Sequence, residues 1–292
     1  MTAIPADVAD VVPAAARWRR VGAPGARRSR KLRWALVLLG LAAVVVVLGP
    51  ALAPADPNEQ DVVNRLASPS GEHVLGTDEL GRDVLSRVIV AARIDVTVGI
   101  VGAVLPFLLG SLLGALAGYV GGFVDSVIGR LTELVLAFPV YVLAIALVTI
   151  MGPGPMSIVI AYTAVGWVQY ARLLRVTMQR VKSEEYIDAA RLGGIGHRSL
   201  VFRHMLPNAM GECLALLAMD VMVVILALSA FSYLGLGIQP PDAEWGAMIA
   251  QGQPYLRTNW WLTLAPGICI TVVGLGFVLL GEHLEERRST HG

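Results

Sequence analysis

The sequence has little charge and few residues that can cross-link the chain. Only 15% of its 292 residues are Asp, Glu, Lys or Arg, 55% are hydrophobic, and the mean hydropathy is +0.66. Soluble domains carry about 25% charged residues, so this composition excludes a wholly water-soluble protein and favours a membrane protein. The two cysteines, Cys213 and Cys269, lie in separate apolar runs and indicate neither a disulfide framework nor a metal site.

Motifs for metal and nucleotide binding are also absent from the sequence. The five histidines are scattered, and no pair of them has metal-ligand spacing. A P-loop requires the pattern G-x-x-x-x-G-K-[ST], but neither of the two lysines, Lys31 and Lys182, follows a glycine. We therefore expect no metal, no cofactor and no catalytic activity in this chain, and any ATP that it depends on must be hydrolysed by another chain.

Long uncharged runs predict an all-α membrane protein with six transmembrane helices. A spanning helix needs about 20 mostly apolar residues, and the polar stretches between spans must lie in water or against protein. The run 134–171 is too long for one span, and "MGPGP" at 151–155 divides it because proline and glycine break helices. The predicted spans are 34–54, 96–124, 131–150, 156–172, 209–233 and 258–281.

The positions of lysine and arginine predict how these helices are oriented. Both residues are concentrated on the cytoplasmic side of membrane proteins. With six spans, one side holds both tails and the second and fourth loops, and it carries 18 of the 23 basic residues. We therefore expect cytoplasmic termini. The predicted organisation is a basic cytoplasmic tail (1–33), a first span (34–54), an extracytoplasmic loop with an amphipathic helix (55–93), a five-helix core (94–281) with a cytoplasmic loop at about 174–207, and a cytoplasmic tail (282–292).

The N-terminal region allows one alternative. Its basic tail, its apolar run and "ALA" at 51–53 resemble a cleavable signal peptide. Against this, the tail before the run exceeds thirty residues and the run is long enough to span. An intact-mass measurement distinguishes the two.

A charged segment, "SEEYIDAARLGGIGHRSLVFRHMLPN" at 183–208, interrupts the apolar runs on the predicted cytoplasmic side. Its small residues recur at i, i+3, i+4 and i+7, which predicts a short helix with one face almost bare of side chains. Such a helix is suited to a groove on a partner protein, and the alternative is a connecting helix that rests on lipid headgroups. The residues of this face are Tyr186, Ala189, Ala190 and Gly193.

The ends of this short helix are also marked in the sequence. Ser183 is the expected N-cap, and Gly193 and Gly194 are expected to end the helix. A second short helix is expected over 197–203, and Pro207 suits the first turn of the next span.

On the predicted outer side, residues 76–93 are expected to form an amphipathic helix capped by Thr77, with Asp83 and Arg87 as an i, i+4 ion pair. That helix either lies on the bilayer surface or contacts a binding protein. Glycines and prolines in "GLGIQPPDAEWG" end regular helix outside the membrane. This region is expected to be a loop and aromatic belt, or alternatively a substrate contact. The tryptophans assigned to the belt are Trp245, Trp260 and Trp261.

The charged segment resembles the EAA loop of ABC-importer permeases, whose pattern is E-A-A, three residues, Gly, nine residues, I-x-L-P. Asp188 stands where Glu is usual, which shortens the acidic arm, and His204 stands where Ile is usual. The residues that match at this spacing are Asp188, Ala189, Ala190, Gly194, Leu206 and Pro207.

Further stretches resemble one branch of these permeases, the dipeptide/oligopeptide permeases of the DppC/OppC type. They are "LGTDELGRDVLSRVIVAARIDVTVGI", "GYVGGFVDSVIGRLTELVLAFP", "YLGLGIQPPDAEWGAMI" and "WWLTLAPGICITVVGLGFVLLG", and they lie between about 73 and 281. The resemblance implies the type I ABC importer permease fold and a multi-pass protein of the bacterial inner membrane.

The resemblance also implies partners. They are a related second permease that completes a heterodimer, two cytoplasmic ABC ATPase domains, an extracytoplasmic substrate-binding protein and a peptide cargo, with lipid around them and no nucleic acid. ATP-driven closure of the ATPase pair would push on the EAA loops and switch the pore between inward-open and outward-open states. The expected coupling residues are Tyr186, Asp188, Ala189, Ala190, Gly193, Gly194, Leu206 and Pro207.

Asp220 is the one acid placed deep within a predicted span. An intramembrane carboxylate is costly unless it faces water, pairs with another group or is protonated, so it is a candidate functional residue. We expect it either to line the translocation pathway or to bridge to a neighbouring subunit.

Other functions remain open from the sequence alone. The same type of permease can carry nickel or another small solute. An ion-coupled secondary transporter needs intramembrane ion ligands and broken helices at matching places in two repeats, whereas this sequence has one such acid and no clear repeat. A purely structural membrane anchor would not need the outer-side signature.

Overall fold

The computed structural model describes residues 24–289, and every regular element in that range is a helix. The expectation of an all-helical protein is thus confirmed for these residues, while the basic tail up to residue 23 lies outside them. Short 3₁₀ turns occupy Val62–Asn64 and Gln253–Tyr255, and a π-helix occupies Leu200–Met205. The α-helices are α1 (Pro24–Leu52), α2 (Val84–Val120), α3 (Gly122–Leu136), α4 (Val140–Met151), α5 (Pro155–Lys182), α6 (Glu185–Leu192), α7 (His197–Ser199), α8 (Leu206–Tyr233), α9 (Trp245–Gly252) and α10 (Trp261–Ser289).

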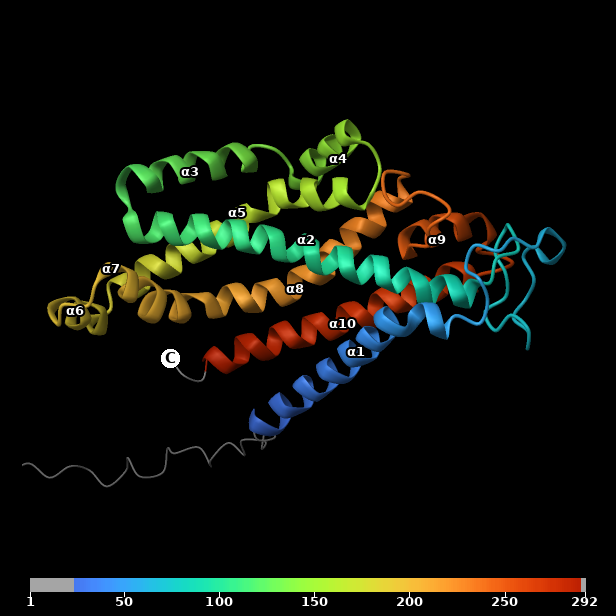
Figure 1. Ribbon diagram of the computed structural model, residues 1–292, viewed down its shortest axis with the longest axis horizontal. Helices are drawn as coiled ribbons and strands as arrows, with labels where there is room; N and C mark the ends of the chain where they lie inside the picture. Colours follow the sequence, from blue (N-terminus) through green and yellow to red (C-terminus); the bar gives the residue numbers. More distant parts are fainter. Residues whose placement is uncertain (1–23, 290–292) are drawn as a thin grey trace, which may run out of the picture.

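The long helices lie along one axis of an elongated bundle (Figure 1). Helix α2 packs against both α5 and α8, and α1 packs against α10. Helices α6 and α7 form one end of the bundle, and the start of α1 and the end of α10 lie toward that same end (Figure 1). The loop between α1 and α2 and helix α9 form the opposite end.

Four helices in the described range are long and apolar enough to cross a membrane: Arg30–Leu52, Val84–Val120, His197–Tyr233 and Trp261–Glu286. The pair α3 and α4 makes a fifth if it is counted as one broken span. The chain is therefore a multi-pass membrane protein.

The predicted span 131–150 is not one straight helix. The chain leaves helix geometry at 137–139, and α3 and α4 meet at 82°. Pro139 lacks a backbone donor and disfavours helix at the residue before it, which accounts for the break. Helix α5, which contains the predicted span 156–172, has enough length but is not among the apolar candidates, and half of its residues are buried.

The separate amphipathic helix predicted before the second span is wrong, because α2 is one continuous helix of 37 residues. Its N-cap is Asp83, whose carboxylate accepts from the backbone N–H of Ser86 at 2.8 Å. Thr77 lies in the preceding loop and is fully buried. The predicted pairing of Arg87 with Asp83 is also replaced, since Arg87 lies 3.6 Å from a carboxylate oxygen of Asp78.

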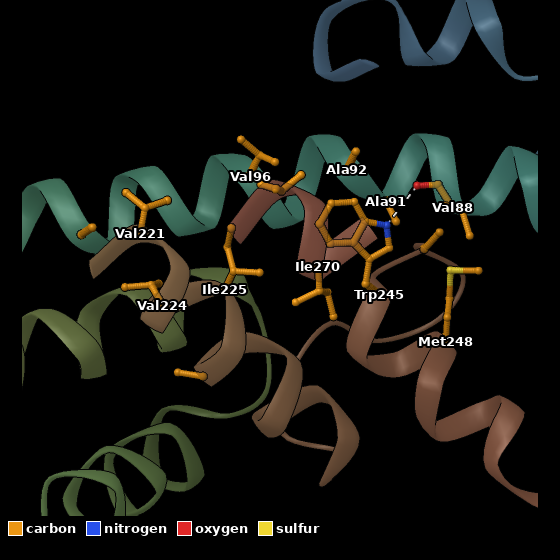
Figure 2. Packing of buried hydrophobic residues seen from close by; sticks show 14 of the residues in the cluster. Val88, Ala91, Ala92, Val96, Val221, Val224, Ile225, Trp245, Met248 and Ile270 are labelled. Atoms are coloured by element: carbon orange, nitrogen blue, oxygen red, sulfur yellow. Dashed lines mark hydrogen bonds between the residues drawn. The ribbon is translucent and has the colours of Figure 1, made fainter. Parts of the chain in front are cut away.

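The main apolar core lies between α2, α8, α9 and α10, and Figure 2 shows it from close by. Trp245 is at its centre. Its indole N–H donates to the carbonyl of Val88 at 3.1 Å, and its backbone N–H donates to Asp95 at 3.2 Å. Trp245 therefore belongs to the core, and its assignment to an interfacial belt is wrong, whereas Trp260 is exposed.

The closest helix contact joins the second half of α2 to α5. Gly110, Gly114 and Gly118 recur every four residues on α2 and face the backbone of α5. A methyl group added at Gly114 would lie 2.5 Å from the carbonyl oxygen of Ala171, and one added at Gly118 would lie 2.7 Å from that of Arg175. Small residues at this spacing let two membrane helices approach closely. Close packing of this kind drives helix association in lipid, because lipid tails are as apolar as the side chains and supply no hydrophobic driving force.

We expect Gly114→Ala to destabilise the protein by about 1–3 kcal/mol, because the added methyl forces α2 and α5 apart. The matched control is Gly40→Ala on α1, where nothing lies within 4 Å of an added methyl group. Thermal unfolding of both variants in the same detergent measures the difference. Equal melting temperatures for the two variants would show that this contact does not constrain the bundle.

Candidate functional site: the coupling segment

The coupling segment, defined as residues 183–208, forms the end of the bundle at which α6 and α7 lie (Figure 1). Glu184, not Ser183, is the N-cap of α6, and no side chain caps this end. The hydroxyl of Ser183 instead donates to the carbonyl of Arg180 at 2.7 Å, within the turn that closes α5. The expected cap is therefore wrong, although the short helix is where the sequence predicts it.

One apolar side chain anchors α6 to the bundle. Ile187 is completely buried in a cluster with residues of α5, the π-helix and α8, among them Met178, Leu200 and Met205. A fully buried Ile contributes about 1.5–3 kcal/mol relative to an exposed one. Helix α6 is thus packed against the π-helix, within a cluster that also contains residues of α5 and α8.

The opposite surface of α6 is open. Tyr186 is 44% exposed, Ala189 and Gly193 are exposed, and Ala190 is half-buried against the cluster. This gives the small-residue face that the sequence indicates. Asp188 is also exposed and pairs with Arg191 at 3.0 Å on the same helix.

The structure adds two exposed apolar residues that the sequence analysis did not single out. Leu192, the last residue of α6, is 91% exposed, and Phe202 in the π-helix is 69% exposed. A helical-wheel count restricted to small residues misses both, since neither is small.

The C-terminal end of α6 is a glycine turn. Gly194 has a φ of +77°, its N–H donates to the carbonyl of Arg191 at 3.0 Å, and the N–H of Ile195 donates to Ala190 at 3.2 Å. This pair of bonds is the Schellman arrangement, which favours glycine at the left-handed position. The sequence prediction that Gly193 and Gly194 end the helix is confirmed.

Hydrogen bonds tie the coupling segment to α8 and α2. The side-chain amide of Asn208 donates to the hydroxyl of Tyr186 at 2.9 Å. Tyr119, at the end of α2, is hydrogen-bonded to Nδ1 of His197 at 2.5 Å, and its carbonyl accepts from Lys182 at 2.7 Å. Both flanks of α6 are thereby held on the bundle.

The exit from the segment is continuous helix. The π-helix Leu200–Met205 runs directly into α8, with Leu206 half-buried and Pro207 in the first turn of α8. Pro207 lacks a backbone N–H, so it cannot donate a hydrogen bond to the π-helix turn that precedes it. Its predicted place is confirmed.

The sequence of this chain is similar to those of known transport proteins. Residues 110–290 match the family described as the binding-protein-dependent transport system inner membrane component. The chain is 37% identical to the dipeptide transport system permease protein DppC of Bacillus subtilis (strain 168), over 92% of this chain and 83% of that protein. It is also 37% identical to the di/tripeptide transport system permease protein DppC of Pseudomonas aeruginosa, over 86% of this chain and 85% of that one. The oligopeptide transport system permease protein OppC of Bacillus subtilis is 34% identical, over 89% and 85%.

The chain belongs to this family of transport permeases. The resemblance to ABC-importer permeases is therefore confirmed, and it extends beyond the coupling segment to most of the permease. In the described part of the permease, no three His, Cys, Asp or Glu side chains are grouped so as to hold a metal ion.

Asp220 lies apart from the coupling segment, inside the bundle of the permease. It is 4% exposed, and its two carboxylate oxygens accept hydrogen bonds from the hydroxyls of Tyr162, at 2.7 Å, and Tyr170, at 2.8 Å. Both partners belong to α5 of the same chain. The pathway role and the bridge to another subunit stay predictions.

We expect Gly194→Ala to loosen the end of α6, because a residue with a Cβ pays about 1–2 kcal/mol in the left-handed conformation. Gly193→Ala is the matched control, since Gly193 has a φ of −71° and its added methyl meets only ordinary contacts at 3.4 Å. Hydrogen exchange at the Ile195 amide should be about tenfold faster in the first variant than in the second. Equal exchange in both variants would contradict the turn described above.

Proposed function

We propose that this permease is one transmembrane subunit of an ATP-driven ABC importer for dipeptides or oligopeptides in the inner membrane of a bacterium. It forms half of the translocation pathway, and a related second permease forms the other half. Two cytoplasmic ABC ATPase domains bind and hydrolyse the ATP, and an extracytoplasmic binding protein delivers the cargo. The chain itself is not catalytic and needs no cofactor.

The observation that carries this proposal is the geometry of α6. It presents an open small-residue face and the exposed Leu192, while Ile187 on its other side is fully buried. A helix that only connects two spans needs no such anchor. A lever needs both features, a surface for the partner and a fixed joint to the membrane helices.

The proposed topology has six passages through the membrane: α1, α2, the broken pair α3–α4, α5, α8 and α10. Four of these are apolar enough by themselves, and the broken pair makes a fifth. Helix α5 is the sixth, and its polar side chains are consistent with its packing against α2, α4 and α8. The coupling segment then shares its side with the start of α1 and the end of α10, as the basic residues on that side predict.

The peptide cargo is supported by the names of the relatives, which are dipeptide, di/tripeptide and oligopeptide transport permeases. The outer-side stretches also resemble that branch, and a purely structural membrane anchor would not need them. Transport would proceed by rocking of the two permeases between two states, driven by contacts with the ATPases that differ between those states.

The proposal predicts that Leu192→Asp disrupts ATPase docking, because a charge replaces an apolar side chain in the contact and must be desolvated there. We expect co-purification of the ATPases and ATP-driven peptide uptake in proteoliposomes to fall at least about tenfold. The matched control for ATPase co-purification is Val63→Asp, which is equally exposed, at 93%, but lies in the loop at the end away from α6.

Normal ATPase binding and normal uptake by Leu192→Asp would remove α6 as the docking surface. Uptake of peptide by vesicles that hold this chain alone with an ion gradient would instead favour a secondary transporter. Loss of uptake with catalytically inactive ATPases would support the importer.

A further inference from the structure

The two helices that flank the coupling segment are joined deep in the bundle by one carboxylate. Asp220 projects from α8, and the hydroxyls of Tyr162 and Tyr170 on α5 each donate to a different oxygen of it. All three side chains are buried. The two tyrosines are eight residues apart, about 12 Å along a helix, so they approach the carboxylate from its two sides.

A second polar contact joins the same helices nearer to the coupling segment. Thr177 donates to Glu212 at 3.1 Å, and Arg180 of the same helix donates to it at 3.3 Å. The pair α5–α8 is thus held at two depths, at Glu212 close to the end of the bundle and at Asp220 farther in. Asp220 lies fourteen residues after Leu206, the first residue of α8, which places it about 21 Å along that helix.

Directional bonds matter more in this environment than apolar contacts do. Lipid tails satisfy an apolar side chain as well as a neighbouring helix does, so apolar packing alone fixes the register of two membrane helices weakly. A carboxylate bound by two hydroxyls allows one register only, because hydrogen bonds weaken steeply when they are stretched or bent.

We infer that Asp220 is a positioning residue, which clamps α5 to α8 so that both helices follow the coupling segment as one rigid body. This rests on the proposed function for its link to transport. In this account the charge of Asp220 does not meet the cargo, and what matters is that its two oxygens or an equivalent pair of polar atoms hold Tyr162 and Tyr170.

Two variants separate the clamp from a pathway charge. Asp220→Asn removes the charge but keeps one acceptor and adds a donor, which the tyrosine hydroxyls can both use. The triple variant Tyr162→Phe, Tyr170→Phe, Asp220→Leu removes the carboxylate and both hydroxyls together, and replacing hydrogen-bonded partners by apolar groups of similar shape is nearly neutral for folding. The clamp predicts near-normal ATP-driven uptake for the first variant and about a tenfold lower uptake per ATP hydrolysed for the second.

A distance measurement tests the clamp without any transport. In an assembled complex whose permease has Cys213→Ala and Cys269→Ala, spin labels at Ile160 on α5 and Leu226 on α8 report the helix pair beyond Asp220; both sites are exposed in this chain. The triple variant should broaden their distance distribution, and Asp220→Asn should not.

The control pair of labels is Val176 and Leu214, which are exposed and lie beside the Glu212 contact. Their distances should stay narrow in every variant, which also shows that the protein is folded. Unchanged Ile160–Leu226 distances in the triple variant, or uptake lost equally in Asp220→Asn, would overturn the clamp. If the unmodified complex shows no ATP-driven uptake, the proposed function fails, while the label distances still decide the clamp.

Discussion

The backbone contact between α2 and α5 is the constraint on which the rest of the bundle depends. Three glycines let α2 lie against α5 so closely that even one methyl group has no room. This contact places α5, a helix with several polar side chains, within the bundle, where its tyrosines reach Asp220. The same contact fixes the end of α5 from which the coupling segment departs.

From that fixed point, the coupling segment is joined to the membrane helices by several small contacts of different kinds. The side chain of Ile187 is buried in the bundle, and Asn208 of α8 donates a hydrogen bond to Tyr186 of α6. The π-helix continues without a break into α8. None of these contacts alone would make a stiff joint. Together they leave one face of α6 exposed and hold its other face on the bundle.

The parts of the structure that the sequence predicted well are those set by local chemistry or by long apolar runs. Gly194 ends α6 because only a residue without Cβ adopts its φ cheaply, and the apolar runs coincide with α1, α2, α8 and α10. The sequence misled where a tertiary partner decides the role. Thr77 and Ser183 have the chemistry of caps but bond to other groups, and Trp245 has the chemistry of a membrane belt but fills the core.

Some features were visible in the sequence but carried no meaning without a neighbour. The spacing of Gly110, Gly114 and Gly118 is plain in the sequence, yet only the position of α5 shows which helix they admit. Asp220 was recognised as costly to bury, but its tyrosine partners lie 50 and 58 residues away along the chain. Likewise, Asp95 lies just outside the predicted second span, and only the fold shows that it is buried and accepts from the backbone N–H of Trp245.

The length of α2 has a consequence for the end of the bundle opposite the coupling segment. Its 37 residues extend about 55 Å, whereas the hydrocarbon layer is only about 30 Å thick. One or both ends of the helix must therefore stand clear of the lipid. At the end where α2 begins, Val84, Val88, Trp245 and Met248 form a dry interior of the kind found in soluble domains. This end of the bundle is therefore a preformed, closely packed structure rather than a flexible loop.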